Sequence, residues 1–245
     1  MVLHKTKAIV LRTVKYGETS VIATMYTELF GVQSFMINGV RSSAKSAAGK
    51  ANLLQPSAIL ELVMYHNDKG NLQRIKEFRW AYLYQDLLFN VIKNSIALFM
   101  VELLQKTLKE PEVNAELFYF IEDAFTHLDE SKDTVMANYP LFFALHLTSF
   151  YGFRFRDTWS ESRNILDLQE GEFVNDLPHH PHYLAGQQAF ITSELLKVQL
   201  PSELSDIKLN QETRRALLHA YQVFYALHFP DFGIMKTLPV LKEIL

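Results

Sequence analysis

Residues 7–27 read KAIVLRTVKYGETSVIATMYT, and this stretch decides the fold of the first part of the chain. β-Branched, aromatic and other apolar residues alternate with polar ones on both sides of Tyr16-Gly17-Glu18, which carries turn-forming chemistry. The pattern predicts a strand at residues 7–15, a short turn, and a second strand at residues 19–27.

The same pattern continues to about residue 79 and predicts three more strands, at residues 32–38, 58–66 and 72–78. An open sheet of five short strands would leave exposed edges, so a closed small barrel is the better solution. The connection at residues 41–55 contains four alanines and is expected to hold a short helix. This arrangement matches the OB-fold, a five-stranded Greek-key barrel whose face and loops commonly bind oligonucleotides.

From Trp80 onward the apolar residues recur at helical spacing. Helices are expected from about residue 83 to before Pro111, and at residues 111–128, 134–151, 188–200, 210–229 and 238–245, with a kink or a new start at Pro140. Residues 152–186 have no clear period and collect Gly and Pro, which predicts an irregular or short-stranded insert. The sequence therefore predicts a multidomain α+β protein, with an OB-fold barrel at residues 1–80 and an all-α domain at residues 81–245 that carries the insert.

The formal charge is unevenly distributed. The whole chain carries −3, but residues 1–80 carry +6 and residues 81–245 carry −9. A positive field concentrates polyanions and a negative field repels them, so the two domains are expected to have different partners.

Several classes of function are excluded or disfavoured. The chain has no cysteine, so disulfides, thiolate zinc sites and cysteine nucleophiles are excluded. It contains no GxGxxG, P-loop, HExxH or GxSxG motif, which disfavours nucleotide hydrolysis and zinc proteolysis. No apolar run approaches the ~20 residues that a bilayer span needs, and no signal-peptide core is present. A cytoplasmic protein without a cofactor is expected.

Two clusters contain the residue types of metal sites. His179-His180-Pro181-His182, with Asp176 nearby, has the ligand types for zinc or nickel, but its prolines favour a surface loop. The acidic groups Glu122-Asp123 and Asp129-Glu130 with Asp133 suit a two-metal enzyme, but a solvated helix face and loop explain them as well. No metal site is predicted from either cluster.

The basic residues of the first domain suggest nucleic acid as its partner. On a small barrel they could converge on one surface, where phosphates need cations and bases need apolar faces such as Tyr16, Phe35 or Tyr65. Ordinary solvating charge remains the alternative for any single residue. The candidate DNA-binding residues are Arg12, Lys15, Arg41, Lys45, Lys50, Arg74 and Lys76.

A second candidate site lies in the helix that begins at Asn210. Arg214 and Arg215 fall near its first turn, where positive charge opposes the helix dipole, and they border an aromatic face. Two cations beside an aromatic face would suit the end of an acidic, hydrophobic peptide. An ordinary amphipathic helix is the alternative.

Several short segments follow one another along the chain in a characteristic order and spacing: Ala8-Ile9-Val10-Leu11-Arg12, Tyr16-Gly17-Glu18-Thr19, Gly31, Asn38-Gly39-Val40-Arg41, Lys45-Ser46, Leu54-Gln55-Pro56, and Met235-Lys236-Thr237-Leu238 with Leu241. In the order and spacing of these segments the chain resembles the RecO family of bacterial DNA repair proteins. The resemblance covers both predicted domains, and the first 60 or so residues carry the specific signal.

The resemblance implies a non-enzymatic recombination mediator that binds single- and double-stranded DNA in the nucleoid and anneals complementary strands. It also implies association with RecR and with the acidic tail of single-strand binding protein, and loading of RecA onto gapped DNA. We expect the tail near Arg214, Arg215 and Lys236. Many members carry a four-cysteine zinc site in the insert, which this chain cannot form, so apolar packing must hold its insert. An RNA-binding OB protein with a helical scaffold is the alternative.

Overall fold

The computed structural model describes residues 2–41, 45–67, 70, 72–109 and 111–245, and for residues 45–48 it describes the backbone alone. The chain forms two compact units, Met1–Gln85 with Leu104–Thr126, and Asp86–Leu103 with His127–Leu245. The division passes through helices α2 (Val91–Thr107) and α3 (Ala115–Glu130), so each unit contains part of both helices.

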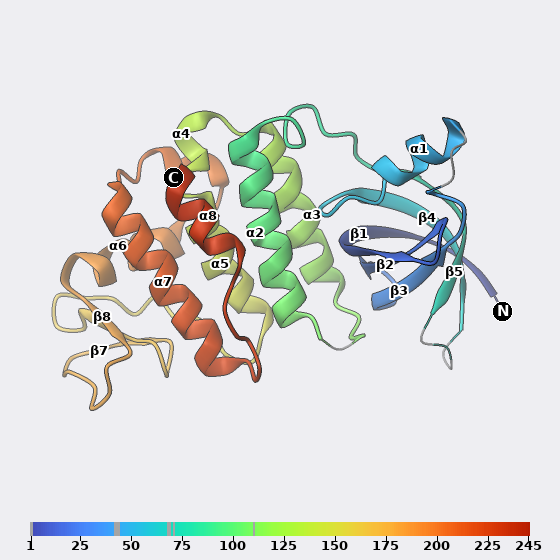
Figure 1. Ribbon diagram of the computed structural model, residues 1–245. Helices are drawn as coiled ribbons and strands as arrows, with labels where there is room; N and C mark the ends of the chain where they lie inside the picture. Colours follow the sequence, from blue (N-terminus) through green and yellow to red (C-terminus); the bar gives the residue numbers. More distant parts are fainter. Residues whose placement is uncertain (1, 42–44, 68–69, 71, 110) are drawn as a thin grey trace. The chain divides into compact units, whose positions relative to one another are not determined.

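The first unit contains the predicted five-stranded barrel (Figure 1). Its strands are β1 (Val2–Tyr16), β2 (Ser20–Thr27), β3 (Gly31–Ile37), β4 (Ile59–His66) and β5 (Gln73–Trp80), and the predicted short helix α1 (Lys45–Asn52) lies between β3 and β4 in the chain. The barrel closes in the order β1-β2-β3-β5-β4. All pairs are antiparallel except β3 with β5, which are parallel and in register only at Phe35 with Gln73 and Met36 with Arg74. The prediction of an OB-type barrel is confirmed.

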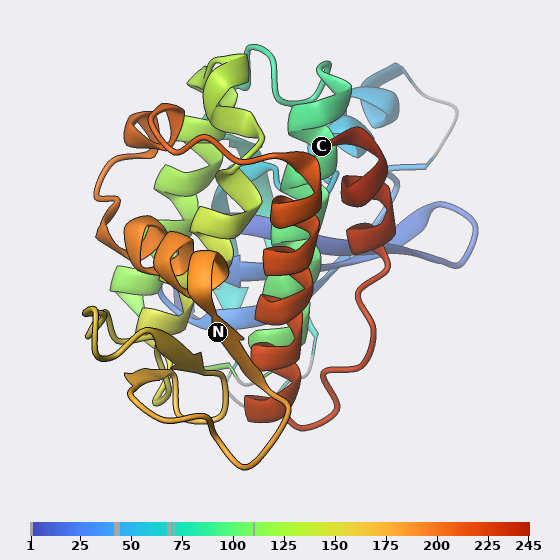
Figure 2. The ribbon, with the colours of Figure 1, turned by 90° about the vertical axis from the view of Figure 1, so that its left-hand side faces the viewer.

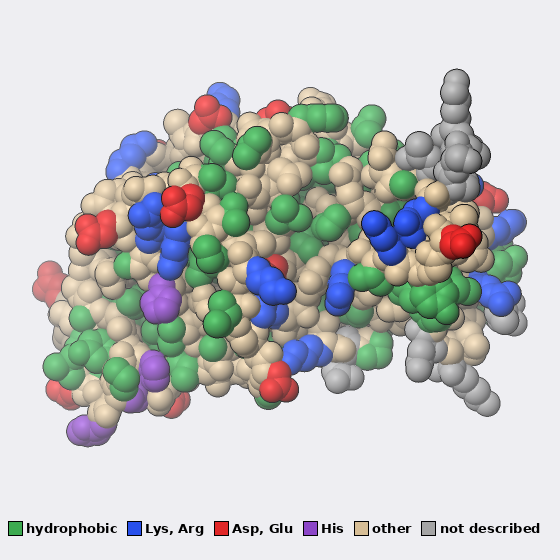
Figure 3. Space-filling model, viewed as in Figure 1, with side chains coloured by type: hydrophobic (Ala, Val, Ile, Leu, Met, Phe, Trp, Pro, Cys, Tyr) green, Lys and Arg blue, Asp and Glu red, His purple; other side chains and the backbone are tan. Residues whose placement is uncertain are grey.

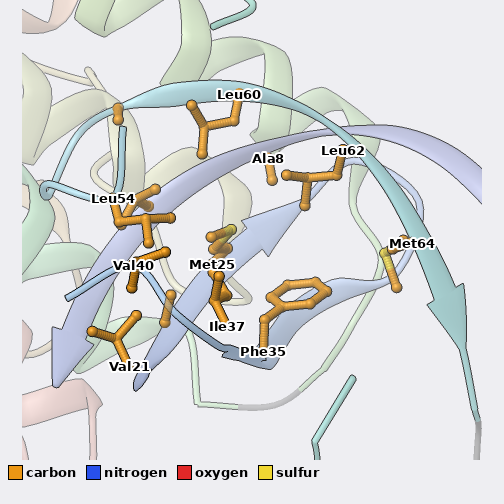
Figure 4. Packing of buried hydrophobic residues seen from close by; sticks show 13 residues of the cluster. Ala8, Val21, Met25, Phe35, Ile37, Val40, Leu54, Leu60, Leu62 and Met64 are labelled. Carbon is orange, nitrogen blue, oxygen red and sulfur yellow. The ribbon is translucent and has the colours of Figure 1, made fainter. Parts of the chain in front are cut away.

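Alternate side chains of the strands fill the barrel interior (Figure 4). Phe35 is completely buried, and its ring lies among the other side chains of the interior. Strand β5 adds the partly buried Ile75, Phe78 and Trp80, which pack against this cluster. The buried members of this cluster are Ala8, Val10, Val21, Ala23, Met25, Phe35, Ile37, Val40, Leu54, Ala58, Leu60, Leu62 and Met64. The period-2 pattern that predicted the strands thus supplies the barrel core.

The outer face of β1 and β2 is also covered. Ile9 and Tyr26 are buried although they lie outside the interior cluster. The Tyr26 ring lies 5.9 Å from that of Phe118, and its hydroxyl donates to the Asn114 carbonyl at 3.0 Å. The pKa of Tyr26 is raised to about 12, chiefly because burial disfavours the phenolate. The start of α3 therefore covers one side of the barrel, and ligands must use another.

The second unit is helical, as predicted (Figure 2). Its remaining helices are α4 (Asp133–Met136), α5 (Tyr139–Leu147), α6 (Gly186–Lys197), α7 (Gln211–His228) and α8 (Thr237–Ile244), with 3₁₀ turns η1 (Thr148–Phe150) and η2 (Pro201–Ser205). The predicted helix at residues 134–151 is divided because Pro140 lies in the first turn of α5. Among the described residues, no helix is long and apolar enough to cross a membrane.

The insert is a small three-stranded sheet. Its strands β6 (Ile165–Asp167), β7 (Glu172–Val174) and β8 (Tyr183–Ala185) lie in the order β7-β6-β8. Leu166, Phe173 and Leu184 are buried, one from each strand. Apolar packing is therefore present in the insert, as the absence of cysteine requires.

Two predicted boundaries were wrong by the largest margins. The helix expected from residue 83 begins at Val91, because the Asn90 side chain caps it by accepting hydrogen bonds from the backbone N–H groups of Ile92 and Lys93. Strand β1 begins at Val2 rather than at residue 7, because residues 2–7 pair with β4. The polar residues His4, Lys5 and Thr6 interrupt the apolar pattern there, so the sequence did not predict this part of the strand.

Candidate nucleic-acid interface

A β-bulge in β5 orients two of the predicted DNA-binding residues. Val63 pairs with Glu77 and the next residue of β4, Met64, pairs with Ile75, so Lys76 has no partner on β4. Arg74, Lys76 and Glu77 are all exposed, whereas Ile75 and Phe78 pack toward the core. The bulge thus adds an extra cationic side chain to the outer face of β5.

Two cavities beside β5 share lining residues, and we call them together the barrel groove. The first, of about 400 Å³, is lined by Met36, Ile37, Asn38, Val40, Lys50, Arg74, Ile75, Lys76 and Phe78. The second, of about 490 Å³, is lined by Lys5, Lys50, Glu61, Val63, Lys76, Glu77, Phe78 and Arg79. Lys50, Lys76 and Phe78 line both cavities, so the two cavities are neighbours on the barrel surface.

The barrel groove carries more positive than negative charge. It is lined by five Lys or Arg residues and two carboxylates, and Lys and Arg side chains lie among exposed hydrophobic ones on the barrel (Figure 3). Lys50 and Arg74 form no ion pair with another described residue. Phosphates favour such cations, and the apolar side chains of Ile75 and Phe78 suit the faces of unpaired bases.

Arg41 lies next to this groove. Its guanidinium donates to the Gly17 carbonyl at 3.1 Å, and its backbone N–H donates to the Thr19 carbonyl at 3.0 Å. Ser20 donates to the side chain of Asn38, a residue that lines the groove, at 2.9 Å. These contacts join the β1–β2 turn to the end of the groove.

The other predicted residues are placed less specifically. Arg12 and Lys15 are exposed toward the end of β1 but do not line the groove. The side chain of Lys45 lies outside the described residues. The structure therefore brings together Lys50, Arg74 and Lys76 of the predicted set.

Lys5 and Arg79 are groove residues that sequence reasoning missed. Each lies just outside a predicted strand, Lys5 before the first and Arg79 after the fifth, in segments that the structure adds to β1 and β5. The expected stacking role of Phe35 was wrong, because its ring is completely buried in the barrel core. Phe78 is instead the aromatic residue of the groove.

Arg214 does not form the exposed rim that we expected. It is buried, and its guanidinium donates to the Asn138 side chain at 3.2 Å and to the carbonyls of Leu245 and Leu209 at 2.7 and 3.1 Å. Burial lowers its pKa. The positive charge of Arg214 in the first turn of α7 is therefore compensated by oxygen atoms of the same unit.

The other two residues of that candidate site are more accessible. The half-buried Arg215 donates to the Lys242 carbonyl of α8, which runs beside α7 in both ribbon views (Figures 1 and 2). Its Nε is buried without a hydrogen-bond partner among the described residues. Lys236 is exposed at the start of α8.

Some members of the candidate metal clusters make contacts within the chain. The Nε2 atom of His180 lies 3.3 Å from Asp167. Glu122 pairs with Lys7, and Asp129 accepts two backbone N–H groups, from Asp86 and Leu87. Within the part of the chain that the structure describes, no three His, Cys, Asp or Glu side chains are arranged to hold a metal ion.

Comparison with known proteins places the chain in a family. Residues 1–84 match the family model described as Recombination protein O N terminal, and residues 88–236 match Recombination protein O C terminal. The chain is 33% identical over 244 residues to DNA repair protein RecO of Christiangramia forsetii, covering 100% of this chain and 99% of the relative. It is 32% identical to the proteins of the same name from Bacteroides fragilis, with 99% of both chains covered, and Flavobacterium johnsoniae, with 98% covered. These matches confirm the resemblance seen in the sequence, and the chain belongs to the RecO family of DNA repair and recombination proteins.

Proposed function

We propose that this protein is a DNA-binding recombination mediator and that the barrel groove holds the DNA backbone. The observation that carries the proposal is that Lys50, Arg74 and Lys76 line two neighbouring cavities together with apolar residues such as Ile75 and Phe78. Arg41 and the β1–β2 turn extend this surface at one end. Family membership supports DNA as the polyanion.

The proposed activity is annealing of complementary strands, without a catalytic residue. Two polyanions approach each other when cations neutralise their phosphates and when bases stay exposed for pairing. The barrel groove offers both conditions without covalent chemistry. We therefore place the protein among mediators rather than enzymes, acting in the cytoplasm at the nucleoid.

The family also supports proposals about partners. We propose RecR and the acidic tail of single-strand binding protein as partners, and loading of RecA onto gapped DNA as the outcome. The tail would bind the second unit near Arg215 and Lys236, where a cation remains exposed at the start of α8. Arg214 has no role in this proposal, because it is buried and each of its three guanidinium nitrogens already donates to an oxygen of the same unit.

The test is neutralisation of the groove by Lys50→Gln, Arg74→Gln and Lys76→Gln in one variant. Single-stranded DNA binding should weaken, and the slope of log K against log salt should fall by about 2, since each lost phosphate contact removes about 0.7 from the slope for single strands. A control variant neutralises Lys132, Arg154 and Arg163, three exposed cations of the second unit, and should keep the slope.

An unchanged slope in a folded groove variant would refute the assignment. The same titration with RNA of equal sequence tests the alternative class. Binding of RNA in clear preference to DNA would favour an RNA-binding OB protein.

A further inference from the structure

One carboxylate of the barrel groove is bound in an unusual way. Glu61 lies on the outer face of β4, directly opposite Arg79 on β5. Its Oε2 atom accepts from Nε and Nη2 of Arg79 at 2.9 and 2.6 Å, and it lies 3.5 Å from Nζ of Lys5. A single carboxylate oxygen therefore attracts two of the five cations of the groove.

This arrangement imitates the contact that a phosphate would make. The guanidinium group of arginine binds carboxylates and phosphates through the same N–H donors, and an ammonium group adds a second charge. The hydrogen bond from Arg79 lowers the pKa of Glu61, so the carboxylate is ionised at neutral pH. Glu61 thus occupies the position on Arg79 and Lys5 that a backbone phosphate would take.

The other groove carboxylate makes a useful comparison. The side chain of Glu77 is 70% exposed, and its ion pair is with Lys76, whose Nζ atom lies 3.9 Å from Oε1 of Glu77. The side chain of Glu61 is only 28% exposed. Both carboxylates line the same cavity and carry the same charge, but only Glu61 is held by two cations.

We propose that Glu61 is a built-in competitor of the DNA backbone, which holds Lys5 and Arg79 and so confines phosphate binding to the Lys50, Arg74 and Lys76 part of the groove. The inference rests on the proposed function and adds regulation of the same site. A mediator must release the strand after annealing, and a shorter phosphate footprint weakens binding and speeds release. Glu61 would limit the number of phosphates that the groove binds.

The test compares Glu61→Gln with Glu77→Gln in the full chain. Each removes one negative charge from the same groove, but only the first frees two cations. Fluorescence anisotropy with a labelled single-stranded oligonucleotide, over a series of salt concentrations, gives the slope of log K against log salt. Glu61→Gln should bind more tightly and steepen the slope by about 1.4, which corresponds to two added phosphate contacts. Glu77→Gln should leave the slope nearly unchanged.

A third variant assigns the added contacts. Arg79→Gln in the Glu61→Gln background should remove about half of the added slope, whereas Arg79→Gln alone should leave the wild-type slope unchanged. Equal slopes for Glu61→Gln and Glu77→Gln would overturn the inference. If the variant that neutralises Lys50, Arg74 and Lys76 binds DNA normally, the proposed function and this inference are both wrong. If that variant binds DNA weakly but Glu61→Gln and Glu77→Gln give equal slopes, only the inference about Glu61 is wrong.

Discussion

Gly31 shows how closely one residue can constrain the barrel. It begins β3 with a φ of +61°, and a Cβ atom at this position would lie 2.4 Å from the carbonyl oxygen of Glu112. Both the left-handed backbone and the contact with main-chain atoms exclude a side chain. We expect Gly31→Ala to lower the free energy of unfolding by about 3 kcal/mol or more, as measured by urea denaturation.

Gly39 provides the control for this substitution. Its φ is +73°, but no atom lies within 4 Å of the position of an added Cβ. Gly39→Ala should therefore cost only about 1 kcal/mol, the strain of the left-handed backbone alone. Equal losses in the two variants would show that the close approach of residue 112 does not matter.

Arg214 is expected to stabilise the second unit rather than bind a partner. Its loss would leave the side-chain oxygen of Asn138 and two backbone carbonyls without their donor. Arg214→Ala should cost about 1.5 to 3 kcal/mol, with a fall in Tm by calorimetry, because hydrogen bonds from a charged group are lost and buried oxygens are left without a donor. Lys132→Ala, at an exposed position, should leave Tm nearly unchanged. A stable Arg214→Ala protein with weakened peptide binding would restore the peptide-site interpretation.

At the scale of elements, the packing of α5 against α6 should depend on pH through His146. Its Nε2 atom lies 3.2 Å from the Leu195 carbonyl, and burial lowers the pKa of the imidazole below its ordinary value. The unfolded chain therefore binds this proton at a higher pH than the folded one. The stability that neutral His146 contributes is present above its unfolded pKa of about 6.5 and is lost as pH falls through the folded value.

Urea denaturation between pH 7.5 and 5 tests this expectation. His146→Gln keeps a group that can donate to Leu195 but removes the titration, so it should lose less stability on acidification than the wild type does. The exposed His219→Gln serves as control and should follow the wild type. Parallel curves for wild type and His146→Gln would contradict the assignment.

The elements themselves could largely be predicted from the sequence, because local pattern determines them. Alternation over residues 7–27 marked β1 and β2, and the change to helical spacing after Trp80 marked the second unit. The start of β1 could not be predicted, because His4, Lys5 and Thr6 are polar and only their pairing with β4 makes them a strand. Long-range pairing of this kind leaves no local trace.

The candidate site was predictable in part for the same reason. Exposed cations within correctly predicted strands, such as Arg74 and Lys76, were found. The position of Arg214 in the first turn of α7 was unusual. The sequence alone could not show whether the oxygens that accept from its guanidinium belong to a partner or to the chain itself. They belong to segments before and after α7, and only the fold brings them to the guanidinium group.

At the scale of the whole molecule, the barrel depends on a helix beyond its own strands. Phe118 of α3 is completely buried and contacts Tyr26 of β2. Phe118→Ala should lower the stability of the barrel by about 3 to 5 kcal/mol, through lost burial and the cavity that remains. The chain has two tryptophans, so in a Trp159→Phe background Trp80 on β5 reports on the barrel alone.

The expected result is a lower midpoint of the Trp80 fluorescence transition in urea. Phe190→Ala, which alters a partly exposed ring of the second unit, is the matched control and should leave this midpoint unchanged. If the Trp80 midpoint did not respond to Phe118→Ala, the barrel strands would be stable without α3.

The parallel pairing of β3 with β5 has a consequence for the motions of the barrel. This ladder joins Phe35 to Gln73 and Met36 to Arg74 only, whereas β1 and β4 pair from Val2 to Ile9. Its amide protons should therefore exchange with deuterium through local opening, well before those of β1 exchange by global unfolding. Met36 and Arg74 also line the groove. A nucleic-acid strand lying there would bridge the two sides of this short ladder and slow the exchange of its amides, so their protection would report how often the site is filled.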